Sequence, residues 1–213
     1  MTNFIPVFPL ELVVYPGEDL NLHIFEPRYR QLIQECWAEG KPFGIPAVVN
    51  HRLQELGTLV TITDLRKVYD DGRMDISTRG LRVFRMLELV KQVPDKLYSG
   101  AIVTYPDDVK DGNPEQMQQV LQGMRRLHRY LQVEKQFRKE DAALRAFDIA
   151  HHVGLSLEEE YELLGLFREA QRQEYLKRHL NKALPLLAQM EALKEKVRLN
   201  GHFRNLEPFN FDF

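Results

Sequence analysis

The stretch FPLELVVYPGEDLNLHIFEPRYRQLI, residues 8–33, changes from one hydrophobic pattern to another along its length. Its first part contains two short apolar runs, LELVVYPG (10–17) and LNLHIF (20–25), which are typical of β segments. Pro16 and Gly17 favour a turn between them, because proline fixes φ and glycine tolerates a positive φ. This part of the chain therefore predicts two strands joined by a tight connection.

The second part of the same stretch predicts a helix over about 27–39. Pro27 suits the first helical turn, and Gly40 suits the position just beyond the last turn. One helical face is apolar and contains Tyr29, Leu32, Ile33, Cys36 and Trp37. Cys36 on this face is most simply a small buried hydrophobic residue rather than a nucleophile, since no partner base is evident.

Residues 57–87 predict a strand, a hairpin and a second strand. Asp71-Gly72 is a strong hairpin signal, because both residues tolerate the positive φ of a type I′ turn, and Arg79-Gly80 marks a second bend. A further strand is expected in LYSGAIVTYP (97–106). Roughly six short strands with one inserted helix favour a small, partly closed barrel, which protects its own edges.

The chain changes character near residue 110, after most of its prolines and glycines. Asn113 begins a helix whose apolar positions continue to Leu131, and a second helix is expected over about 142–152. The capping box at Ser156 begins a long helix, in which Pro185 predicts a kink or break. We therefore predict an α+β fold, with a β-barrel subdomain over 1–110, a helical bundle with one long helix over 111–200, and an aromatic C-terminal tail over 201–213.

Composition excludes several classes of protein. Lys plus Arg number 29 and Asp plus Glu 31, a net charge of −2, whereas nucleic-acid binders usually carry a basic excess. A single cysteine excludes an internal disulfide and a multi-thiolate metal site. Apolar runs are too short to span a membrane, and the N-terminus does not resemble a signal peptide, so we expect a cytoplasmic location.

Three polar groups have simple structural interpretations. His151-His152 is a poor metal clamp, because adjacent helical residues point about 100° apart. Three acidic residues precede the helix that begins at residue 113, namely Asp107, Asp108 and Asp111. Negative charge is favourable at the positive N-terminal end of a helix, so this role is favoured over carboxylate catalysis. The densest basic stretch contains Arg125, Arg126, Arg129, Lys135, Arg138 and Lys139. Acidic residues interrupt this stretch, so a solvated helix face is favoured over RNA binding, which stays the main alternative.

Residues 8–33 strongly resemble the start of the Lon N-terminal domain family. This family is the substrate-recognition module of Lon proteases, and it also occurs in cereblon and in free-standing bacterial proteins. Later segments follow the family's order, over roughly residues 5–200: GTLVTI (57–62), VYDDGRMDIS (68–77), RGLRVFRML (79–87) and LYSGAIVTYPDD (97–108). The resemblance is to a free-standing bacterial member without the ATPase and peptidase domains.

The resemblance implies a PUA-like β pseudo-barrel followed by helices, with a role in holding unfolded or degron-bearing polypeptides and no chemistry of its own. We expect binding through a groove between barrel and helices, with a separate protease or ATPase as a further candidate partner. Candidate polypeptide-binding residues, of which some are expected to be core, are Phe25, Arg28, Tyr29, Tyr69 and Phe84. Glu26 lies at a helix entry, and Arg28 is expected to pair with a carboxylate that fixes the strand-to-helix corner.

The chain lacks the catalytic motifs of a complete Lon protease. Its only Gly-Lys pair, Gly40-Lys41, is followed by Pro42, so it cannot form the GxxxxGK[ST] phosphate loop. No serine has the small-residue setting of the family's nucleophile. We therefore predict no enzyme activity, catalytic residue, metal or cofactor; a structural or assembly role is a further alternative.

The tail GHFRNLEPFNFDF contains Phe203, Phe209, Phe211 and Phe213. Exposed aromatic rings are unfavourable in water, so we expect the tail to dock on the barrel or on a neighbouring chain. The alternatives are a disordered tail and a recruitment motif for a protease. One hypothesis is that it competes with clients for the same groove.

Overall fold

The computed structural model describes residues 3–202 and the side chains of residues 3–199. A six-stranded antiparallel sheet comes first and helices follow, which confirms the predicted α+β class. The strands are β1 (Asn3–Pro6), β2 (Asp19–Ile24), β3 (Phe43–Val49), β4 (Arg52–Val68), β5 (Met74–Val90) and β6 (Gly100–Thr104). The α-helices are α1 (Pro27–Glu39), α2 (Pro114–Leu131), α3 (Ala146–Ile149), α4 (Leu157–Leu164) and α5 (Glu169–His202), and two 3-10 turns cover Asp141–Ala143 and Ala150–His152.

The sheet closes into a barrel with one additional strand at its side. Its order is β1-β6-β5-β4-β3, and β2 pairs with the first half of β5. The chain after β1 then runs beside β3, where Phe8 N–H donates to Gly44 O at 2.8 Å and Val48 N–H donates to Leu10 O at 2.8 Å. These bonds join the two ends of the sheet, so β2 is the strand left at an edge.

The predicted strand over 10–17 is wrong, because a single isolated bridge, from Leu10 to Ala47, occurs there. Val13, Val14 and Tyr15 are all buried, but on different sides. Val13 and Tyr15 pack in the core formed with helices α2 to α5, whereas Val14 packs in the core under α1. This segment lies between two cores instead of in a ladder. Gly80 accommodates it, since a Cβ at that position would collide with Tyr15 O, and β5 continues through Gly80 without the predicted bend.

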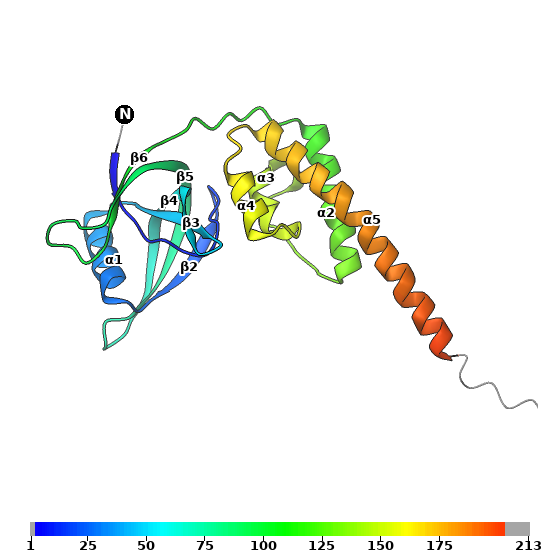
Figure 1. Ribbon diagram of the computed structural model, residues 1–213, viewed down its shortest axis with the longest axis horizontal. Coiled ribbons are helices and arrows are strands. Elements are labelled where there is room, and N and C mark those ends of the chain that lie inside the picture. Colours follow the sequence, from blue (N-terminus) through cyan, green and yellow to red (C-terminus); the bar gives the residue numbers. More distant parts are fainter. Residues whose placement is uncertain (1–2, 203–213) are drawn as a thin grey trace, which may run out of the picture.

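Helix α1 begins and ends at the predicted residues. Gly40 adopts the left-handed conformation, φ 62°, and its N–H bonds to the last turn. Tyr29, Leu32, Ile33 and Cys36 are buried against one side of the barrel, whereas Trp37 is exposed. Figure 1 shows α1 on the side of the barrel opposite the helical part.

The helical part departs from the sequence prediction at two places. Residues 142–152 form α3 between 3-10 turns rather than one helix. The predicted long helix from residue 156 is broken between α4 and α5. The segment between β6 and α2 takes the backbone hydrogen bonds at the break: Val109 N–H donates to Phe167 O at 2.8 Å, and Glu169 N–H donates to Val109 O at 2.9 Å. Helix α5 does not break at Pro185. Pro185 is exposed, so water can solvate the carbonyl that its missing N–H leaves free.

Barrel and helices share one core. Val13, Tyr15 and Leu56 of the barrel part pack with buried leucines of α4 and α5. Tyr15 also donates its hydroxyl to Glu160 O at 3.0 Å, and the Tyr161 hydroxyl accepts from Leu56 N–H at 3.2 Å. The two parts are therefore held together by packing and by hydrogen bonds. Within residues 3–202, no helix has the length and hydropathy needed to cross a membrane.

Candidate functional site

The five residues selected from the sequence separate into buried and exposed groups. Phe84 is 0% exposed inside the barrel, and Tyr29 is buried with its ring stacked on Phe8, centroid to centroid 3.8 Å. These two are core residues: Phe84 has no surface to offer a ligand, and Tyr29 is only 7% exposed. Phe25 is 60% exposed at the end of β2, Arg28 is exposed at the start of α1, and Tyr69 is half-buried near the β4–β5 turn.

Phe25 and Tyr69 are brought together by a residue that the sequence analysis missed, His23. The His23 ring stacks on Phe25 at 6.3 Å between centroids and meets Tyr69 edge-on at 5.9 Å. Asp75 holds His23 and Tyr69 in place, because its carboxylate lies 2.6 Å from His23 Nδ1 and accepts a hydrogen bond from the Tyr69 hydroxyl at 2.8 Å. These hydrogen bonds lower the pKa of Asp75. We call His23, Phe25 and Tyr69 the aromatic cluster.

Two cations lie over the Tyr69 ring of the aromatic cluster. Lys67 Nζ lies 4.3 Å and the Arg73 guanidinium carbon 5.3 Å from the centre of the Tyr69 ring, both within cation–π range. Arg28 Nε donates to Glu26 at 2.8 Å, so the carboxylate expected to pair with Arg28 at the corner between β2 and α1 is that of Glu26. The cluster is thus an exposed apolar surface with charges of both signs beside it, since Arg28 and Arg73 pair with carboxylates and Asp75 bonds to the cluster.

The outer edge of β2 has unpaired backbone groups. Gly80 N–H donates to Glu18 O at 2.9 Å, and the register then pairs Leu20 with Thr78 and Leu22 with Ile76. Since hydrogen-bonded pairs alternate in an antiparallel ladder, even-numbered β2 residues bond to β5. The backbone groups of Asp19, Asn21 and His23 therefore point away from the sheet, and no other described strand pairs with them.

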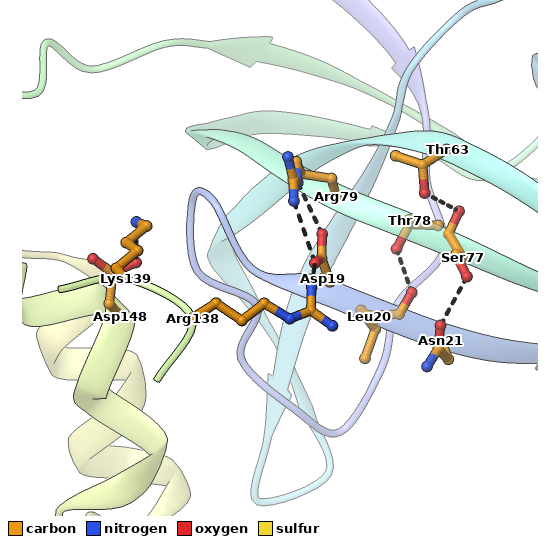
Figure 2. Close-up of polar contacts among 10 residues, drawn as sticks. All are labelled: Asp19, Leu20, Asn21, Thr63, Ser77, Thr78, Arg79, Arg138, Lys139 and Asp148. Atoms are coloured by element: carbon orange, nitrogen blue, oxygen red, sulfur yellow. Dashed lines mark hydrogen bonds and ion pairs between the residues drawn. The ribbon is translucent and has the colours of Figure 1, made fainter. Parts of the chain in front are cut away.

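A groove of about 520 Å³ lies between barrel and helices at the Asp19 end of β2. Its walls combine charged residues with apolar ones such as Phe137 and Phe147. Figure 2 shows Asp19 held by Arg79 at 2.8 Å and by Arg138 at 3.2 Å, with Lys139 and Asp148 paired at 2.6 Å beside them. None of the five selected residues lines this groove, so their predicted placement there is wrong. The apolar surface is instead at the opposite end of β2.

His151 links the two parts of the molecule beside this groove. Its Nδ1 lies 2.7 Å from Glu160 on α4, and its Nε2 lies 3.1 Å from Glu18 on the barrel. Burial alone would lower the pKa of His151, but the hydrogen bonds to Glu160 and Glu18 outweigh it and raise the pKa to about 9. His151 therefore carries a positive charge at neutral pH and bridges two carboxylates. The sequence gives no signal for this bridge, because Glu18 is 133 residues away.

Other candidate groups have structural roles. Cys36 is buried, and burial raises the pKa of its thiol to about 12, so the thiolate is not available as a nucleophile. Within the part of the chain that the structure describes, no three His, Cys, Asp or Glu side chains are placed to hold a metal ion. Asp111 accepts from Ala170 N–H at 3.2 Å and pairs with Arg168, so it caps α5 rather than the helix at residue 114. The basic stretch is partly neutralised, since Arg125, Arg138 and Lys139 each pair with an aspartate.

A family model described as the ATP-dependent protease La (LON) substrate-binding domain matches residues 5–182. The chain belongs to this family. The Lon N-terminal domain protein from Xanthomonas campestris is similar in structure, with a TM-score of 0.62 and 27% identity over 82% of this chain and 96% of that one. The N-terminal domain of the Mycobacterium avium complex Lon protease has the same fold, with a TM-score of 0.61 and 16% identity over 85% of this chain and 100% of that one.

Membership of the Lon substrate-binding family confirms the resemblance found in the sequence and makes this chain a substrate-binding module. The aromatic tail, Phe203 to Phe213, lies outside the described residues, and its docking stays a prediction.

Proposed function

We propose that this chain is a non-catalytic polypeptide-recognition module that holds unfolded or degron-bearing proteins as an added strand on β2. The family supplies the class of ligand, since its members are substrate-binding domains. The outward edge of β2 carries the proposal, because an extended peptide can pair with the free N–H and C=O groups of Asp19, Asn21 and His23. Such backbone pairing is independent of client sequence, as a tolerant binder requires.

The aromatic cluster would supply apolar affinity at one end of this edge. A client strand that pairs with β2 reaches Phe25 as it passes His23, so an apolar or aromatic client residue can cover the exposed ring. The groove at the other end offers the charges of Asp19, Arg138 and His151 to polar client residues, beside apolar residues of its own walls. This division predicts a preference for clients with an apolar residue at one end of the bound segment.

The test is to block the edge without disturbing the ladder. Asn21→Pro removes an outward N–H and places a ring where the client strand would lie, and proline is tolerated on strand edges. We expect affinity for a labelled unfolded client, measured by fluorescence anisotropy, to fall roughly tenfold or more. Asn21→Ala is the matched control, because it keeps the N–H and loses only the side-chain bond from Ser77 Oγ, 2.8 Å (Figure 2).

Unchanged affinity in Asn21→Pro, with a folded circular dichroism spectrum, would show that clients do not bind along β2. The same titration with structured RNA at two salt concentrations separates the main alternative, since RNA affinity falls steeply with salt. No feature of the described residues favours RNA over polypeptide, because three of the basic residues of the stretch are already paired.

A further inference from the structure

The second half of α5 carries an apolar stripe that the proposed function does not use. Leu186, Met190, Leu193 and Val197 are between 60% and 66% exposed, high values for large apolar side chains. Figure 1 shows this half of α5 extending beyond α2, α3 and α4, which gather around its first half. No described residue covers the stripe, so four large side chains face water together, as in an unpartnered interface.

The spacing of the stripe is that of a coiled coil. Its members are separated by four, three and four residues, which is the heptad repeat of a and d positions and not the broader stripe of a helix packed on a globular core. The same spacing reads identically in both directions along the helix. An antiparallel copy would therefore place Leu186 opposite Val197 and Met190 opposite Leu193, with every apolar side chain matched.

The flanking positions agree with pairing between two copies. Glu191 and Glu195 are engaged within the helix, with Lys194 at 3.7 Å and with Arg198 at 3.8 Å. In the antiparallel register, Lys194 lies beside Leu187 and Lys196 beside Gln189 of the other copy, so like charges do not meet. The surface needs no oppositely charged partner and is complementary to itself.

We infer that this chain forms a two-fold antiparallel dimer through residues 186–197 of α5. A parallel pair would bring both helical parts to the same end of the coiled coil, where α2 and α3 already pack on α5 (Figure 1). The antiparallel pair places the two bodies at opposite ends. A two-fold axis between residues 191 and 192 makes the interface closed, so dimers do not extend into filaments.

The mass of the full chain in solution is the first test. Sedimentation equilibrium should give twice the 25.0 kDa of one chain at micromolar concentration. The double variant Met190→Glu/Leu193→Glu should weaken association roughly 100-fold or more, because the carboxylates would be buried against apolar side chains. Leu199→Glu is the matched control: it is exposed on α5 but outside the stripe, and it should leave the dimer intact.

Disulfide formation tests the orientation. In an equal mixture of Met190→Cys and Leu193→Cys chains, mild oxidation should join the two variants to each other, since positions 190 and 193 face one another across the axis. The native Cys36 is buried and does not interfere. Like-with-like disulfides would refute the antiparallel register. A monomeric full chain would refute the dimer; if removal of residues 203–213 then produced a dimer, the tail would be the natural occupant of the stripe.

Discussion

Phe84 and Phe25 have the same side chain in opposite environments. The Phe84 ring fills the barrel, where it lies against the Cα positions of Gly44 and Gly57, whereas the Phe25 ring projects from the end of β2. Burial decides what each contributes: Phe84 stabilises the fold, and Phe25 is available to a client.

The first prediction separates stability from binding at these residues. Phe84→Ala should lower the free energy of unfolding by about 3–5 kcal/mol, through lost burial and a cavity. Phe25→Ala should change it by no more than about 0.5 kcal/mol and weaken client binding roughly tenfold. Urea denaturation and anisotropy titration measure the two quantities. Full client affinity in Phe25→Ala would remove the aromatic cluster from the site.

The second prediction concerns His151, whose pKa is raised from 6.5 to about 9 in the folded chain. Between pH 6.5 and about pH 9, the folded state therefore holds a proton on His151 that the unfolded state has released. The stabilisation is complete below pH 6.5 and is lost as the pH rises through 9. Because the side chain is 32% exposed, we discount for solvent screening and expect a loss of about 1–2 kcal/mol.

Urea denaturation at pH 6.5 and pH 9.5 measures this loss. His151→Gln should be less stable than the parent at pH 6.5 and should lack this part of the pH dependence. His51→Gln is the control, because His51 pairs only with Glu11 at an exposed site. A His151→Gln profile that parallels the parent would show that the bridge from Glu18 to Glu160 does not stabilise the fold.

Among the elements, α2 depends on its first residues. Asn113 Oδ1 accepts from Glu115 N–H at 2.8 Å and from Gln116 N–H at 3.2 Å, which satisfies two otherwise free donors. Asn113→Ala should lower the free energy of unfolding by about 1 kcal/mol. Asn113→Asp keeps an acceptor and should retain most of the stability. Equal losses in both variants, measured by thermal denaturation, would contradict a capping role.

The elements that the sequence predicted well are those with local signals at both ends. Helix α1 has Pro27 and Gly40, and α2 has Asn113 and an apolar face that continues to Leu131, each within a few residues of the boundary it sets. The break before α5 depends on Val109, a residue distant in sequence. The irregular segment at Val13–Tyr15 likewise depends on two cores that no local pattern reveals.

The candidate site was predictable only in part for the same reason. Residue type and family motif pointed to Phe25, Arg28 and Tyr69, which are all accessible, and equally to Phe84, which is enclosed. Adjacent strand residues alternate between faces, but β5 lies opposite a register shift between Leu59 and Val60, so the face of Phe84 could not be read from its position. His23 joins the cluster through Asp75, a contact across two strands.

At the scale of the whole molecule, the shared core fixes β2 relative to α5, because α4 packs on β3 and β4 and buried leucines of α5 belong to the same core as Tyr15 and Leu56. In the proposed antiparallel dimer, the α5 N-termini would be on the order of 70 Å apart at 1.5 Å per helical residue. One β2 edge would then lie in each body, at either end of the coiled coil. A single unfolded chain of roughly 150 residues has a comparable root-mean-square span and could occupy both edges.

The last prediction follows from this geometry. Met190→Glu/Leu193→Glu should weaken binding of such a long client roughly tenfold or more, since the second contact is no longer intramolecular. Binding of a short peptide that fills one edge should be unchanged, because neither substituted residue lies near β2. Parallel anisotropy titrations of both ligands measure the difference, with Leu199→Glu as the dimeric control. Equal affinities of dimer and monomer for the long client would show that the two edges act separately. If the affinity for the short peptide also fell, α5 would belong to the client-binding site itself.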